Sequence, residues 1–192
     1  TIVGVFKTGT TISGRVYYHK DSTGGVGFKP SSDGLSGWNY NTSSGRVDGS
    51  VKAGTLEPSK AYIGSYSYKQ NGSAIGFLNG ANKTVANDTA NPISYSSNSI
   101  KYIGSHPNFA VHSHTLWNGE VAELMVFNQQ LSDEQLSQIN AHLANKWGLT
   151  TTVDSDADGI VDANDSDSPA GGGSLSSDST TDSDNDGITD AI

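Results

Sequence analysis

The chain contains no cysteine, so no disulfide framework can stabilise it, and its stability must come from packing or from bound ions. It has no apolar run of the length that a membrane span requires, which predicts that it does not insert into a bilayer. Helical patterns are nearly as scarce, since one stretch alone carries a convincing helical period. These absences predict a β-rich protein outside the membrane.

Basic residues are missing from the last part of the chain. All 11 lysines and arginines precede residue 150, together with 9 of the 20 acidic residues, so the first part carries a formal charge of +2. The other 11 acidic residues follow without a base and give a formal charge of −11. A near-neutral first part argues against nucleic acid as a partner. An acidic tail without counter-charges is expected to collect cations.

Short β-rich runs separated by turn signals fill the chain up to about residue 104. Pairs such as Asp48-Gly49 and Asn79-Gly80 mark the turns. No helical pattern lies between the runs, which argues against a parallel α/β sheet and predicts an all-β sandwich or barrel. The runs are Ile2–Phe6, Ile12–Tyr18, Val26–Phe28, Trp38–Tyr40, Val47–Val51, Ala61–Ile63, Ile75–Leu78, Val85 and Ile100–Ile103.

A strand and one amphipathic helix end this β-rich part. Val121–Phe127 forms the strand. The Ser132 hydroxyl and the Gln135 side chain can each accept from the other residue's amide, which is a capping box at the start of a helix. Leu131 and Leu136 have the spacing of a hydrophobic staple around that cap.

The helix is expected to end at Gly148, which has the position of a C′ glycine. Its apolar face must lie on something apolar, and we expect it to cover an edge or the rim of the sandwich. Trp147 is expected in the core, because it shares that face with Leu136, Ile139 and Leu143.

The same stretch resembles a known family. Four segments follow the order and spacing found at the end of bacterial laminin G-like domains: Gly119–Leu124, Phe127-Asn128, Leu131–Glu134 and Leu143–Leu149. That family has the concanavalin A-like jelly-roll fold, so the resemblance implies an antiparallel jelly-roll β-sandwich with one C-terminal helix over residues 1–149. It also implies recognition of glycans or proteins through loops at the rim of the sandwich.

The composition changes after Leu149. Residues 150–192 consist mostly of Asp, Ser, Gly and Thr, and such a segment cannot bury enough apolar surface to fold without a ligand. We expect a separate, irregular acidic segment here that binds calcium and contains a flexible Gly/Ser linker over residues 168–181.

One loop in this segment has the oxygen pattern of a calcium site. Carboxylates at positions 1, 3 and 5, a glycine at position 6, a carbonyl at position 7 and further acids at positions 9 and 12 can supply the six to eight oxygens that Ca²⁺ prefers. The predicted ligands are Asp154, Asp156, Asp158, the Ile160 carbonyl, Asp162 and Asp165. The loop resembles a thrombospondin type 3 or dockerin-like calcium repeat more than an EF-hand, because position 12 is Asp and not Glu. The alternative is a solvated acidic linker.

A second copy of the pattern lies near the end of the sequence. It predicts a further calcium loop with ligands from Asp182, Asp184, Asp186, Ile188 and Asp190. Repeated loops of this kind resemble those that stack through shared ions into a stiff stalk.

Two other constellations are candidates for ligand binding. His112 and His114 lie on one side of an extended chain, near His106 and Trp117, and can either ligate zinc or copper or belong to a ligand-facing or plain surface loop. Trp38, Asn39 and Tyr40 combine aromatic rings with an amide, which suits a sugar face as well as an ordinary core.

No pattern of a catalytic site stands out. Glu120 and Glu123 are three residues apart and therefore point to opposite faces of a regular strand, which does not suit a pair of glycosidase carboxylates. No nucleophile elbow, P-loop or dinucleotide fingerprint is present. We therefore expect a protein that is not an enzyme.

The sequence favours an extracellular binding or adhesion module with a calcium-stabilised stalk, within a longer bacterial surface or filament protein. Its expected partners are a glycan or a surface protein and the other domains of the same chain. The alternative is a structural spacer or filament subunit that calcium makes rigid. Chelation separates the two, since a spacer is expected to lose order in the tail while the sandwich stays folded.

Overall fold

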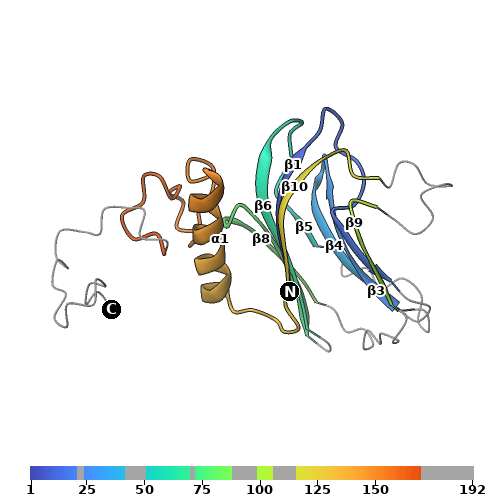
Figure 1. Cartoon of the computed structure of the whole chain (residues 1–192). Coiled ribbons are helices and arrows are strands. Elements are labelled where there is room, and N and C mark those ends of the chain that lie inside the picture. The colour runs from blue at the N-terminus through green and yellow to red at the C-terminus, as the bar shows by residue number, and fades with distance from the viewer. Residues whose placement is uncertain (21–23, 42–50, 70–71, 88–98, 106–115, 170–192) are drawn as a thin grey trace.

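The computed structural model describes residues 1–20, 24–41, 51–69, 72–87, 99–105 and 116–169. This part of the chain forms two antiparallel sheets of five strands each and one α-helix (Figure 1). The prediction of an all-β fold with one late helix is confirmed. Val47 and part of the Val47–Val51 run lie outside the described residues.

Neighbouring strands in both sheets run antiparallel. The first sheet has the order β10 (Gly119–Val126), β1 (Ile2–Thr8), β6 (Ala61–Tyr68), β7 (Ser73–Leu78) and β8 (Asn82–Asn87). The second sheet has the order β5 (Val51–Ala53), β4 (Gly34–Asn41), β3 (Gly24–Ser31), β2 (Tyr17–Lys20) and β9 (Ile100–Ile103).

The two sheets pack face to face around an aromatic core. Phe6 of the first sheet meets Phe28 of the second edge-on, with ring centroids 5.9 Å apart and an interplanar angle of 83°. The Tyr66 ring fills the space above Gly37, where an added Cβ would lie 1.9 Å from a ring carbon. A side chain at position 37 would therefore push the sheets apart, which gives this glycine a packing reason.

A second apolar cluster lies on the outer face of the first sheet. Helix α1 (Asp133–Trp147) covers it, so the expectation that the helix covers an edge or rim was wrong (Figure 1). The physical reason is that strand β1 is apolar on both faces, and both faces must then be covered. The fully or largely buried members are Val3, Val5, Ile63, Phe77, Leu131, Leu136, Leu143, Ala144 and Val153.

The helix begins and ends as predicted. The Ser132 hydroxyl accepts from the Gln135 amide, and the Gln135 side chain accepts from the Ser132 amide, which completes the capping box. Gly148 follows the helix in the left-handed conformation, with φ of 67°. Trp147 does not lie in the core as expected, because it is 42% exposed and its ring faces the edge strand β10. Within the described residues, no helix has both the length and the hydropathy to cross a membrane.

Candidate metal centre

The segment after the helix, residues 149–169, is here called the extension, and it lies beside the helix in Figure 1. Its residues Leu149 and Val153 pack in the apolar cluster on the outer face of the first sheet. Val153 is fully buried in the cluster beneath the helix. The Asp154 amide then donates to the Asn79 carbonyl, 3.1 Å away, in the turn between β7 and β8. The first predicted calcium ligand is thus held against the sandwich by its own backbone.

The predicted loop closes on itself through its aspartates. The Asp154 carboxylate at position 1 accepts from the Gly159 amide at position 6, with Oδ2 and N 3.0 Å apart. The Asp156 carboxylate accepts from the Asp158 amide at 3.2 Å, and the Asp158 carboxylate accepts from the Ile160 amide at 2.7 Å. Gly159 has φ of 100°, a conformation that suits glycine at this turn. These bonds curl the chain so that its carboxylates gather on one side.

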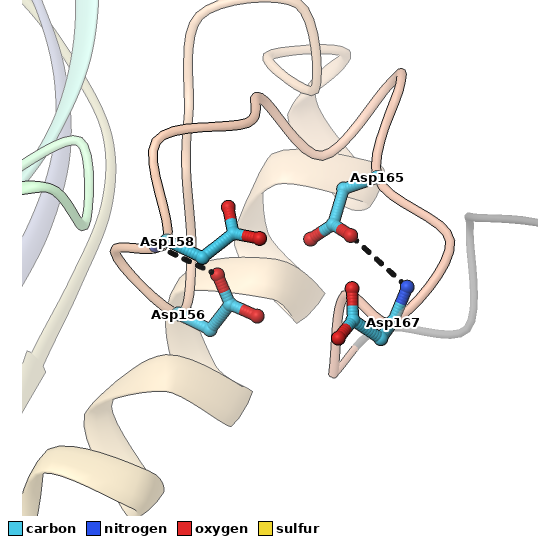
Figure 2. Close-up of side chains that lie close together, drawn as sticks. All are labelled: Asp156, Asp158, Asp165 and Asp167. Atoms are coloured by element: carbon cyan, nitrogen blue, oxygen red, sulfur yellow. Dashed lines mark hydrogen bonds between the residues drawn. The ribbon is translucent and has the colours of Figure 1, made fainter.

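Four carboxylates meet at the centre of the extension. Asp156, Asp158, Asp165 and Asp167 each offer an oxygen, and these oxygens all lie within 4.8 Å of one another. Figure 2 shows Asp156 and Asp158 facing Asp165 and Asp167 across a common space. The Asp167 amide donates to Asp165 Oδ1 at 3.0 Å, which fixes the relative positions of those two residues.

Asp165 is the buried member of this group of four aspartates. It is 1% exposed, and its Oδ2 atom is buried without a hydrogen-bond partner among the residues that the structure describes. The other three are exposed. A buried carboxylate oxygen without a donor carries a desolvation penalty, so this atom needs a cation or a proton.

The electrostatics of the group point the same way. Desolvation, together with the negative charges of its neighbours, raises the pKa of Asp156. The pKa of Asp167 is raised first because its protonated form can hydrogen-bond the Asp165 carboxylate, and then by the negative charge of that carboxylate. Among the ion pairs of the described residues, none involves a member of the group. A divalent cation would relieve this repulsion.

Other predicted ligands lie beside the group. Asp154 is 7% exposed, and its Oδ1 atom is also buried without a partner among the described residues. Asp162 is turned elsewhere, since its two oxygens accept from the Ser155 amide at 2.8 Å and the Ser155 hydroxyl at 2.7 Å. Its role in this structure is to brace the start of the loop. The Ile160 side chain is 46% exposed.

Sequence reasoning missed Asp167. It lies two residues beyond position 12 and therefore outside the twelve-residue calcium-binding pattern. The signal that could have found it is the local Asp165-Ser166-Asp167 pair, which repeats the Asp-x-Asp spacing at the start of the loop.

A cleft of about 840 Å³ lies next to the group of four aspartates. Its lining includes Asp156 and Asp167, the first turns of the helix, the β7–β8 turn and Lys83. The cleft leaves the group accessible to ions and water. It is mixed in character, because Phe77 and Leu136 also contribute to its wall.

A second cavity, of about 460 Å³, lies between the two sheets at the side of β10. Its lining is rich in aromatic rings and includes the amide-bearing residues of the chain after β10. The lining residues with rings or side-chain amides are Tyr17, His19, Tyr66, Tyr68, Phe127, Asn128 and Gln129. Its size and composition fall within the range of small-ligand sites.

The remaining predicted site residues divide into three cases. Trp38, Asn39 and Tyr40 lie on β4, where they pair with Gly27, Val26 and Gly25 of β3. Trp117 packs edge-on against Phe6, with centroids 5.7 Å apart, at the end of the inter-sheet core. The rest lie outside the described residues: His106, His112, His114, Asp182, Asp184, Asp186, Ile188 and Asp190.

No protein-family model matches the chain, and no curated protein matches it either. Fold and site together define a two-sheet β protein with a helix on one outer face and a carboxylate centre suited to a cation. A more particular function has to be argued from the chemistry of the site.

Proposed function

We propose that the chain is an extracellular calcium-binding module of a longer bacterial surface or filament protein, which binds glycan or protein ligands in adhesion. The observation that carries the proposal is the buried Oδ2 atom of Asp165 within the group of four aspartates. Such an atom has no stabilising partner among the described residues, and a bound cation would provide one.

The donor set favours calcium over other cations. All four side chains in the group are carboxylates, and hard oxygen donors suit Ca²⁺ or Mg²⁺ rather than zinc or copper. Mg²⁺ requires a near-ideal octahedron and keeps most of its water, whereas Ca²⁺ accepts six to eight oxygens in flexible geometry. The free Oδ1 of Asp154 and the Ile160 carbonyl, with water from the cleft, would complete such a shell.

The binding role is supported by the resemblance to laminin G-like jelly rolls and by the cavity between the sheets. Tyrosine rings can stack on the C–H faces of a sugar, and neighbouring amides can bond its hydroxyls. The lining of that cavity offers both kinds of group. A glycan is therefore the first ligand class to test.

The alternative function is a spacer or filament subunit that calcium makes rigid. One observation favours it: the carboxylates belong to the extension, and the extension lies beside the helix in Figure 1. A cation there would fix the direction in which the chain leaves the sandwich. The continuation of the sequence into a second acidic repeat agrees with a stalk.

Calorimetric titration of the full chain with CaCl₂ tests the calcium site. We expect saturable binding, weaker binding of MgCl₂, and a loss of at least tenfold in calcium affinity for Asp165→Asn. Glu57→Gln is the matched control, because it removes one charge from an exposed loop between β5 and β6. Equal affinity of Asp165→Asn and Glu57→Gln would contradict the proposed site.

A glycan screen with and without calcium tests adhesion against the spacer. A binding module is expected to retain a defined set of glycans and to lose them on replacement of Tyr68 or Asn128, which line the cavity between the sheets. If the folded, calcium-loaded chain retains no glycan and no surface protein, the spacer is the better description.

A further inference from the structure

A short path of hydrogen bonds joins the extension to the middle of the first sheet. The Asp154 amide donates to the Asn79 carbonyl at 3.1 Å. The Asn79 side-chain oxygen accepts from the Ile63 backbone N–H at 2.9 Å. The Asn79 backbone N–H donates to the Ile63 carbonyl at 2.7 Å. Ile63 lies in β6, and it is 1% exposed in the cluster beneath the helix.

Asn79 is suited to this position by its conformation. Its φ is 51°, in the left-handed region, which asparagine tolerates better than most residues. This conformation turns the chain at the end of β7. The Asn79 side chain can then bond Ile63 while its carbonyl bonds Asp154. Glycine would keep the backbone path and remove the side-chain bond alone.

We infer that Asn79 is a positioning residue that couples cation binding at the extension to the stability of the sandwich. The inference rests on the proposed calcium site. Val153 reinforces the path, since it is fully buried in the same cluster one residue before Asp154. A cation that orders the aspartate loop of the extension therefore also orders Val153, which helps to cover the apolar outer face of the first sheet.

This coupling differs from the behaviour of an independent stalk. A ligand that binds the folded state alone raises the melting temperature of everything that unfolds with its site. For a chain of this size, calcium at 100 times its Kd is expected to raise the melting temperature of the sandwich by about 5 to 10 °C. A stalk that folds by itself would leave that temperature unchanged.

The test compares melting temperatures and calcium affinities of full-length variants. Near-UV circular dichroism reports the aromatic core between the sheets, in excess calcium and in EGTA. Asn79→Gly is expected to bind calcium about tenfold more weakly at 25 °C, which halves the calcium-induced shift at 100 times the wild-type Kd. Asn79→Asp keeps the acceptor for the Ile63 amide and is expected to restore affinity to within a few-fold.

Ser59→Gly is the matched control, because Ser59 also has a positive φ, of 61°, in the turn before β6 and away from the extension. It is expected to leave both the calcium affinity and the shift unchanged. If wild type binds calcium without any shift in the sandwich, or if Asn79→Gly binds as tightly as Ser59→Gly, the inference is overturned. If wild type binds no calcium, the proposed function itself fails.

Discussion

Trp147 donates its indole N–H to the Glu123 carboxylate at 2.8 Å and so joins the last turn of the helix to strand β10. The Lys146 ammonium lies 2.9 Å from the same carboxylate oxygen. The hydrogen bonds from Lys146 and Trp147 hold the pKa of Glu123 below its ordinary value. The helical pattern predicted Trp147 in the core, but its indole N–H instead makes a polar contact that ties the end of the helix to strand β10.

Trp147→Phe is predicted to have a small effect on stability. It keeps an aromatic ring and removes the N–H, and the site is partly exposed, so the loss is expected to stay within about 1 kcal/mol. Urea unfolding at constant calcium measures it. A loss of 3 kcal/mol or more would show that the side chain is a core residue after all.

Leu143→Ala is predicted to destabilise the chain by about 2–5 kcal/mol. Leu143 is 0% exposed beneath the helix, so its truncation leaves a cavity between the helix and the first sheet. Val85→Ala is the control, because Val85 is 51% exposed on β8 and is expected to cost about 0.5 kcal/mol or less. Similar costs for the two variants would mean that the helix does not lie on this face.

Acid is predicted to weaken the turn between β3 and β4. Hydrogen bonds from Lys52 and Ser31 lower the pKa of Asp33 from 3.8 to about 2. Because the folded-state pKa is depressed, the contribution is complete above the unfolded value and is lost as pH falls through the folded value. The pair is more than half exposed, so the contribution is at most about 1 kcal/mol.

Denaturant titrations of wild type and Asp33→Asn between pH 6 and pH 2 measure this contribution. The two stabilities are expected to differ at pH 6 and to converge as pH approaches 2. If the stabilities of wild type and Asp33→Asn differ by the same amount across that pH range, the ion pair between Asp33 and Lys52 is not the source of the difference.

Local patterns in the sequence predicted the features that depend on neighbouring residues. Ser132 and Gln135 are three residues apart, and their capping box forms as expected. Leu131 and Leu136 are both buried in the cluster beneath the helix. Gly148 takes the left-handed conformation that ends the helix. Each of these depends on a spacing of a few residues along one element, and such spacing is visible in a sequence.

The features that the sequence did not reveal depend on contacts between distant segments. The helix covers the outer face of the first sheet because strand β1 is apolar on both of its faces. In the sequence this strand is one continuous apolar run, which does not show which residues face the second sheet and which face the helix. Gly37 is small because Tyr66 of the other sheet lies above it. Asp167 joins the group of four aspartates because the chain turns back after Asp165, and a pattern with fixed positions cannot anticipate that turn.

Gly80→Ala is predicted to displace the extension and to weaken calcium binding by tenfold or more. An added Cβ at Gly80 would lie 1.9 Å from the Asp154 carbonyl oxygen, and the φ of 78° adds backbone strain. Gly148→Ala separates the two causes, because Gly148 has a similar φ of 67° and nothing within 4 Å of the added Cβ. Gly148→Ala is therefore expected to cost about 1 kcal/mol of stability and to leave the calcium affinity unchanged. Equal calcium affinities for the two variants, measured by calorimetry on the folded chains, would show that the contact between the β7–β8 turn and the extension does not position the metal centre.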